Sequence, residues 1–88
     1  MTGRRYVSEY TSDGTFRVLA RREFIDRCAL CGWDLAPNDV CHVVARKNGG
    51  PNTVDNVVML CPNHHRLFDR GAIPVEEVLA ARANCLPG

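Results

Sequence analysis

The chain has 88 residues, of which 45% are hydrophobic, and a formal net charge of +1 at pH 7. This length suits one small domain over residues 1–88 and excludes a second of ordinary size. So small a core usually needs a disulfide, a metal or a partner chain to support it. The near-neutral charge excludes nucleic-acid binding by bulk charge alone, so such a function must rest on local groups.

The sequence has no apolar N-terminal segment and no apolar run of membrane-spanning length. We therefore expect a cytoplasmic protein without a membrane partner. In that compartment cysteines persist as thiols and mark metal sites more often than disulfides. The odd number of cysteines, five, also fits a disulfide framework badly.

The first predicted element is a β-hairpin over about residues 5–20. Two short β-favourable stretches, Tyr6 to Tyr10 and Thr15 to Leu19, lie on either side of a turn signal, Asp13-Gly14. The hairpin is followed by CALCGWDL, which reads as a cysteine knuckle.

Two further strands are predicted at residues 40–45, VCHVVA, and 56–60, NVVML, because both runs are rich in β-branched residues. The segment between them, RKNGGPNTVD, is rich in Gly, Pro and Asn and is longer than most hairpin connections. Loops of this length are often functional.

Two helices complete the predicted α+β fold. The first runs over about residues 62–70, with Cys61 at the N-cap, Pro62 at the first helical position and Gly71 beyond the end. The second runs over about residues 75–84, directly after a proline.

Four residues have the spacing of a structural zinc site: Cys28-x-x-Cys31 and Cys61-x-x-His64. Zinc takes four sulfur or nitrogen ligands in a tetrahedron, and two ligands three residues apart can reach one ion when the backbone between them turns. Each cysteine alone would be a small buried hydrophobe. The four together predict a closed Zn²⁺ site that staples the fold.

Helix geometry separates the adjacent histidines His64 and His65. Neighbouring helical residues point about 100° apart, whereas residues i and i+4 share a face. His65 and Asp69 can therefore face a second partner that His64 cannot reach.

His42, Asn56 and His65, in this order and with the LCPNHHRLFDRG segment, resemble the HNH endonuclease family, and in particular a subgroup whose helix carries HHRLFD. The resemblance covers about residues 28–71. It implies a ββα-metal fold, in which two antiparallel strands and a helix grip a divalent ion, often supported by a zinc site.

The residues present suit metal-dependent hydrolysis of DNA phosphodiester bonds. His42 is the candidate general base, because imidazole titrates near neutral pH. Asn56 could orient His42 or the connecting loop. His65 and Asp69 could hold Mg²⁺, Mn²⁺, Ni²⁺ or Zn²⁺ and leave positions open for substrate. Cys41 stands where the family often has a metal ligand, and it is either an additional ligand or a packing residue that points away from His42.

DNA contact is expected from basic residues near these groups, because the segment from 42 to 70 carries four basic residues against two acidic ones. They are Arg46, Lys47, Arg66 and Arg70. A homodimer would suit cleavage of both strands, and a role in phages, mobile elements or restriction fits a small nuclease. The alternative is a zinc-stapled module that binds nucleic acid or protein on the same scaffold without cleaving it.

Overall fold

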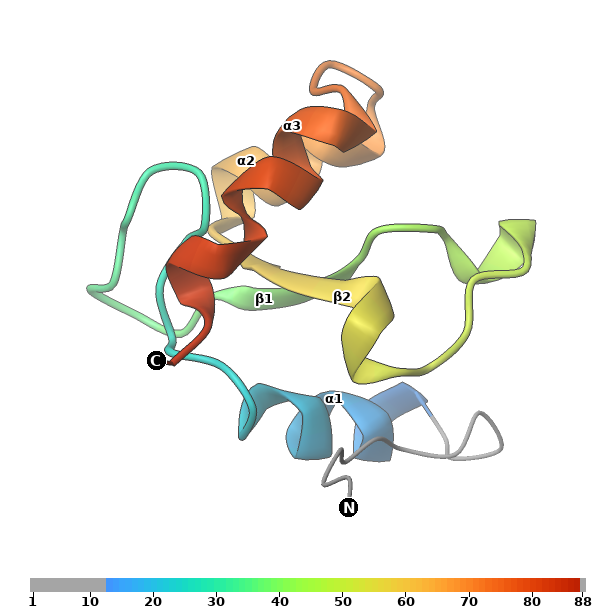
Figure 1. The fold of residues 1–88 in the computed structure, drawn as a ribbon, viewed down its shortest axis with the longest axis horizontal. Coiled ribbons are helices and arrows are strands. Elements are labelled where there is room, and N and C mark those ends of the chain that lie inside the picture. The colour runs from blue at the N-terminus through green and yellow to red at the C-terminus, as the bar shows by residue number, and fades with distance from the viewer. Residues whose placement is uncertain (1–12, 88) are drawn as a thin grey trace.

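The structure is a computed structural model that describes residues 13–87 (Figure 1). Its regular elements are α1 (Asp13–Arg21), β1 (Asp39–His42), β2 (Val57–Leu60), α2 (Pro62–Asp69) and α3 (Val75–Ala81). Three short 3₁₀ turns add η1 (Arg46–Asn48) and η2 (Val54–Asn56) between the strands and η3 (Arg82–Cys85) after α3. The described chain is a small α+β fold, as the sequence predicts.

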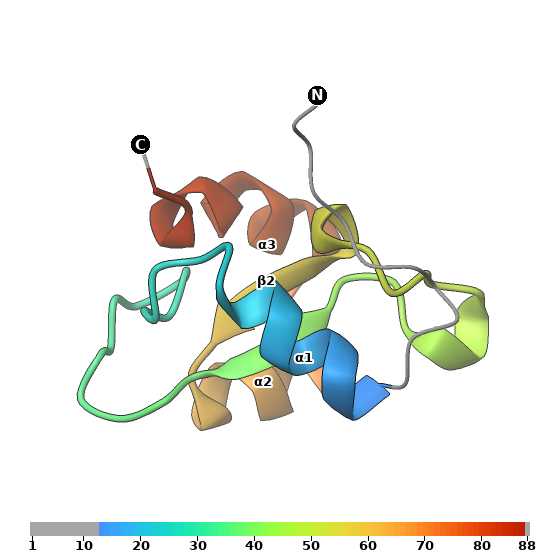
Figure 2. The ribbon, with the colours of Figure 1, turned by 90° about the horizontal axis from the view of Figure 1, so that it is seen from below.

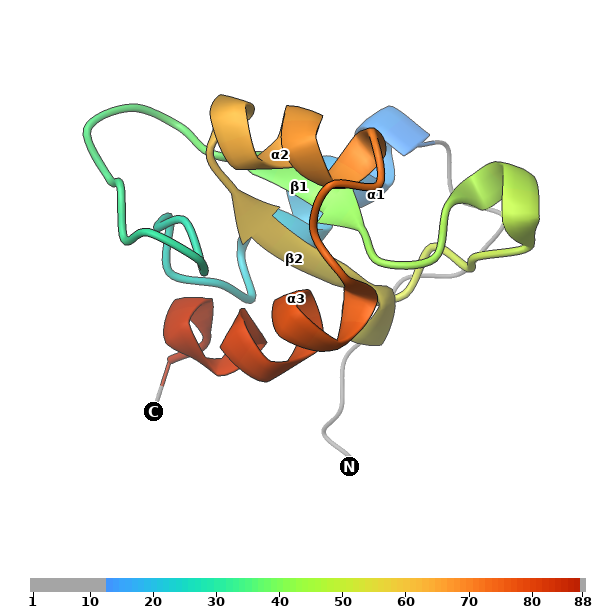
Figure 3. The same ribbon diagram turned by 90° about the horizontal axis from the view of Figure 1, so that it is seen from above.

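The centre of the fold is the antiparallel pair of β1 and β2, in which Cys41 lies opposite Val58 and His42 opposite Val57. The hairpin lies between α1 and α2 (Figure 1), and α1 crosses in front of the strands when the molecule is seen from below (Figure 2). All four residues of β2 are buried, because both of its faces are covered. Seen from above, α2 lies over the hairpin and α3 runs beside β2 (Figure 3).

The predicted strand from Thr15 to Leu19 is wrong, because this segment belongs to α1. Phe16 and Ala20 are fully buried, and their spacing of four residues puts them on one face of a helix. A strand would have buried Val18 as well, yet 58% of Val18 is exposed. The other predicted strand, Tyr6 to Tyr10, lies outside the described residues.

Both central strands form, although each is shorter than predicted. β1 ends at His42 instead of continuing to residue 45, and Asn56 belongs to η2 instead of β2. The pairing continues by one hydrogen bond, from the Val43 N–H to the Asn56 carbonyl (2.7 Å). Beyond it the chain turns away because the Asn56 side chain takes up the backbone of Val44.

The start of β1 is anchored by Asn38, which is fully buried. Its backbone N–H donates to Asp26 Oδ1 (2.8 Å), and its Nδ2 donates to Asp26 Oδ1 and the Trp33 carbonyl (3.1 Å each). These bonds tie β1 to the turn after α1 and to the knuckle. Asn38 therefore fixes where the strand begins.

α2 begins and ends where the sequence predicts. Cys61 is the N-cap and its Sγ accepts from the His64 N–H (3.4 Å), Pro62 is the first residue, and Gly71 follows the end with a φ of 77°. A positive φ is easily adopted by glycine and terminates the helix.

The C-terminal helix is also confirmed, as α3 followed by the tighter turn η3. Val78 and Cys85 are fully buried in the core, and η3, which contains Cys85, contacts β2. Arg82 donates from Nε to the Val57 carbonyl (2.8 Å) and from a terminal nitrogen to the Val54 carbonyl (2.7 Å). The helix thereby holds the segment that leads into β2.

Candidate metal centres and cleft

The predicted zinc ligands Cys28, Cys31, Cys61 and His64 come together at the N-terminal end of α2. Their four ligand atoms all lie within 4.8 Å of one another. His64 Nδ1 is 3.3 Å from Cys61 Sγ and 3.6 Å from Cys28 Sγ, and the sulfurs of Cys31 and Cys61 are 4.0 Å apart. The edges of a zinc tetrahedron are about 3.8 Å between sulfurs and about 3.5 Å between sulfur and nitrogen. The cluster therefore fits one zinc ion.

The backbone around Cys28 favours its thiolate. Burial would raise the pKa of the Cys28 thiol, but N–H groups of Cys61, Cys31 and Leu30 outweigh this effect and lower the pKa to about 7. Zinc binds the thiolate form, so this end of the fold is prepared for a cation before one arrives.

A second group of ligand atoms lies on the other side of α2. Cys41 Sγ and the ligand atoms of His65 and Asp69 all lie within 4.8 Å of one another. His65 Nε2 is 3.4 Å from Asp69 Oδ2, one helical turn further on. Sulfur, nitrogen and carboxylate oxygen make up a donor set that fits a transition-metal ion or zinc better than magnesium. The second centre supplies three protein ligands, which leaves positions open.

Cys41 is buried, and it lies on the face of β1 that carries the second centre. Burial raises the pKa of its thiol to about 12, with further contributions from the carboxylates of Asp69 and Asp39, while Arg17 lowers it. The predicted contrast with His42 holds, because neighbouring strand residues point to opposite faces: Cys41 lies with His65 and Asp69, whereas the His42 ring packs against Phe16. Cys41 therefore lies on the side of β1 that contacts α2, and His42 lies on the other side.

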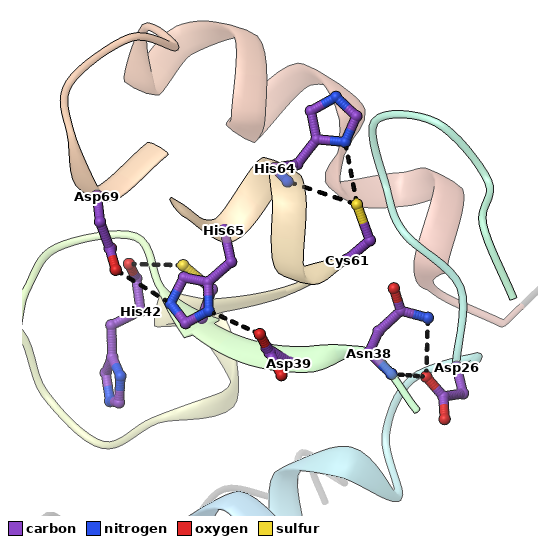
Figure 4. A network of polar contacts seen from close by, with 9 residues as sticks. Asp26, Asn38, Asp39, His42, Cys61, His64, His65 and Asp69 are labelled. Atoms are coloured by element: carbon purple, nitrogen blue, oxygen red, sulfur yellow. Dashed lines mark hydrogen bonds and ion pairs between the residues drawn. The ribbon is translucent and has the colours of Figure 1, made fainter. Parts of the chain in front are cut away.

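Sequence reasoning missed Asp39, which contacts the second centre. Its Oδ2 is 3.0 Å from His65 Nδ1, so one nitrogen of His65 meets Asp39 and the other meets Asp69 (Figure 4). Asp39 precedes Cys41 by two residues, and residues two apart in a strand share a face. That spacing was the available signal, but the predicted strand began at residue 40.

His42 contacts a different set of residues. Its ring is directed away from His65 and Asp69 (Figure 4) and lies 5.6 Å, between ring centroids, from Phe16 of α1. His42 Nε2 is 2.8 Å from Oδ1 of Asn52, a fully buried loop residue that sequence reasoning also missed.

The side chain of Asn56 contacts the loop and not His42 in its described hydrogen bonds. Its side chain holds the loop between the strands: Oδ1 accepts from the Val44 N–H (2.9 Å), and Nδ2 donates to the carbonyls of Val44 and Pro51 (3.0 Å each). Of the two roles considered for Asn56, this geometry is that of a residue that shapes the loop.

Gly50 completes this loop. It is buried, and a β-carbon at this position would overlap the Val44 carbonyl and come within 2.9 Å of Asn56 Nδ2. Only glycine leaves room for the two sides of the loop to approach so closely. Asn56 and Gly50 together set the path of residues 44–51.

An open cleft of about 780 Å³ lies between this loop and the end of α2. His42, Lys47 and Asp69 line it together with apolar residues that include Phe68 and Ile73. Of the four predicted DNA contacts, Lys47 is the one at this cleft. Arg46 is turned back to donate to the Gly50 carbonyl (3.2 Å), whereas Arg66 on α2 and Arg70 directly after it are exposed.

Within residues 13–87, none of the helices is both long and apolar enough to cross a membrane. The search of curated proteins gave no match to this chain. The model of the HNH endonuclease family matches residues 28–76, which include both metal centres, the two strands and α2. The chain therefore belongs to the HNH endonuclease family.

Proposed function

We propose that this protein is a metal-dependent endonuclease that hydrolyses phosphodiester bonds in DNA. The observation that carries the proposal is the position of Asp69, which belongs to the second metal centre and also lines the cleft that His42 and Lys47 line. A candidate base, one candidate ion ligand and a lysine thus line one open space. Family membership supports a nuclease or nucleic-acid-binding function.

In this proposal His42 is the general base. It takes a proton from the attacking water, whose oxygen bonds to phosphorus while the bridging phosphorus–oxygen bond breaks and the departing oxygen gains a proton. His42 is partly buried at the end of β1, so its ring has a defined direction while it still lines the cleft. Asn56 acts indirectly, through the loop that it holds.

The ligands of the catalytic ion would be Cys41, His65 and Asp69. A divalent ion held there would neutralise charge that develops on the phosphate. Asp39 contacts the Nδ1 side of His65, which leaves Nε2 for the ion, and carboxylates in this position commonly orient histidine ligands. The sulfur of Cys41 favours a softer ion such as Zn²⁺ over Mn²⁺ or Mg²⁺.

The Cys28, Cys31, Cys61 and His64 cluster has a structural role in this proposal. It binds zinc, joins the knuckle to the N-terminus of α2, and keeps His65 directed toward the second centre. Four protein ligands close the coordination of zinc and leave no place for substrate.

The substrate is DNA, and its phosphates meet Lys47 at the cleft, with Arg66 and Arg70 along α2. Such contacts position the backbone without reading its sequence, so we expect loose specificity and binding that weakens steeply with salt. Cleavage of both strands would be served by a homodimer. A cytoplasmic protein of a phage, a mobile element or a restriction system is the setting that fits this activity.

The competing function is a zinc-stapled module that binds nucleic acid or protein without cleavage. Cys41 favours this alternative. A buried thiol with a pKa of about 12 gives up its proton less readily than a carboxylic acid or an imidazolium group, so it is a poorer ligand for a catalytic ion.

The test is cleavage of supercoiled plasmid by the zinc-loaded protein with Mg²⁺, Mn²⁺, Ni²⁺ or Zn²⁺ added in turn. The proposal expects nicked or linear products with at least one ion, and a loss of about 10²–10⁴-fold in His42→Ala, the range that a general base contributes. Glu76→Ala, at an exposed position of α3, is the control and should cleave like the wild type. Retained plasmid binding without cleavage by any ion would favour the binding module, and equal cleavage by His42→Ala would remove His42 as the base.

A further inference from the structure

The contact between His42 and Asn52 determines which nitrogen of the imidazole carries a proton. His42 Nε2 lies 2.8 Å from Asn52 Oδ1. An amide oxygen has no proton and can only accept, so Nε2 must be the donor. In the neutral ring the other nitrogen, Nδ1, then keeps its lone pair.

We infer that Asn52 is a positioning residue for the general base: it holds His42 in the Nε2–H form, so that Nδ1 receives the proton of the attacking water. This inference rests on the proposed function for the role of His42. Asn52 thereby orients the His42 imidazole, a role that the sequence suggested for Asn56.

The surroundings of Asn52 give it a fixed position. Its side chain is fully buried, so the loss of a hydrogen-bonding partner at Oδ1 would leave a desolvated acceptor. Asn52 follows Gly50 and Pro51, whose path is set by the Asn56 hydrogen bonds and by the close approach of Gly50 to Val44. The amide is therefore in place before any substrate binds.

His42 is restrained from two directions. Phe16 of α1 packs against the ring, with centroids 5.6 Å apart and planes inclined at 39°. Strand pairing with Val57 fixes its backbone. His42 also lines the cleft. With Nε2 directed to buried Asn52, Nδ1 is the ring nitrogen that remains for a water there.

Asn52 and Asn56 are thus distinguishable by what they touch. Asn56 hydrogen-bonds only to backbone groups among its described contacts, at Val44 and Pro51. Asn52 hydrogen-bonds to the imidazole itself. A change at Asn56 should distort the loop, whereas a change at Asn52 should alter His42.

The first measurement needs no substrate. Long-range ¹H–¹⁵N NMR spectra of the zinc-loaded wild type report the tautomer of each histidine, and His42→Ala identifies the His42 signals. The inference expects the Nε2–H form for His42, with a ring N–H signal that exchanges slowly with water. An Nδ1–H form for His42, or rapid exchange of its ring proton, would overturn it.

The second measurement compares Asn52→Leu with Asn52→Asp. Leucine has a similar size but cannot accept a hydrogen bond, whereas aspartate keeps an acceptor oxygen at the same place. Asn52→Leu should lose the protected N–H signal of His42. It should lower kcat by about 10- to 100-fold with little change in KM, a smaller effect than that of His42→Ala, because the general base itself is still present. Asn52→Asp should keep the N–H signal. Its log kcat should recover at least a third of the difference between Asn52→Leu and the wild type.

Thr53→Val, at the next position of the same loop, is the matched control and should match the wild type in both measurements. Zinc content and thermal melting establish that each variant is folded. Wild-type kcat in folded Asn52→Leu would overturn the inference. If the wild-type protein cleaves nothing, the proposed function fails, but the NMR experiment still decides whether Asn52 fixes the tautomer of His42.

Discussion

The two candidate metal centres are supplied by adjacent residues of one helix, yet they are built in different ways. His64 completes a set of four sulfur and nitrogen ligands, and His65 belongs to a set of three that includes a carboxylate. The first set has enough ligands to close around one zinc ion, and the second lies where Asp69 meets the cleft. A rotation of about 100° around the axis of α2 thus separates a centre suited to stability from one suited to chemistry.

The thiols of Cys28 and Cys41, one from each centre, differ in their pKa. Backbone N–H groups around Cys28 lower its pKa to about 7, whereas burial and two nearby carboxylates raise the pKa of Cys41 to about 12. Backbone N–H groups thus favour the thiolate of Cys28, whereas the Cys41 thiol keeps its proton because it is buried beside two carboxylates.

The largest expected effect is loss of the first centre. Structural zinc contributes on the order of 10 kcal/mol in small zinc-stabilised folds, which is comparable with the whole stability of a small domain. Cys28→Ser, or removal of zinc with a chelator, should abolish cooperative melting followed by circular dichroism. Cys85→Ser, at a buried cysteine outside both centres, should retain zinc and a melting transition. A chelated protein that melts like the zinc-loaded one would contradict the structural role.

Substitution of the two histidines tests the comparison most directly. His64→Ala should lose stoichiometric zinc and thermal stability, because it opens the closed centre. His65→Ala should keep one zinc per chain and lose cleavage, because it changes only the second centre. Metal analysis, melting and plasmid cleavage on both variants give the result. If both lost zinc, the division of the helix into two centres would be wrong.

A change in the loop should affect His42 and the cleft but not the zinc centre. Gly50→Ala forces a β-carbon against the Val44 carbonyl and the Asn56 amide, and overpacking of this kind costs about 1–3 kcal/mol. That cost lowers the melting temperature of a small domain by roughly 4–8 °C per kcal/mol. We expect a matching loss of cleavage with zinc content unchanged. Gly14→Ala, where a β-carbon meets open space, is the control and should not reduce stability.

The smallest effect concerns Asp39, which touches a candidate ligand but is not one itself. Asp39→Ala should weaken binding of the catalytic ion by about 10-fold, at the lower end of what such outer carboxylates contribute. Isothermal titration of Mn²⁺ or Ni²⁺ into zinc-loaded protein measures this change, with Asp34→Ala as an exposed control. Unchanged affinity in Asp39→Ala would remove Asp39 from the support of His65.

The sequence was sufficient for features that depend on local spacing. The Cys28 and Cys61 pairs, the caps of α2 and the separation of His64 from His65 all follow from a few neighbouring residues, and the structure has them as predicted. Thr15 to Leu19 was misassigned because a short apolar alternation also permits a helix that buries only Phe16 and Ala20.

The contacts that the sequence did not reveal depend on the folded path of the loop. Asn52 and Asn56 are four residues apart with the same side chain, and only their positions after folding give one to His42 and the other to the backbone. Asp39 required the correct start of β1. Local patterns therefore predicted the metal ligands better than the groups that position them.

The anchoring of Asn38 to Asp26 and Trp33 has a consequence for the register of β1. Side chains alternate along a strand, so the number of residues between Asn38 and each of these residues decides which face Cys41 and His42 occupy. A shift of one residue would turn Cys41 toward Phe16 and His42 toward α2, so the sulfur and the imidazole would exchange sides. A single-residue insertion between Asn38 and Cys41 should therefore be far more damaging than an insertion of two, which restores the original sides.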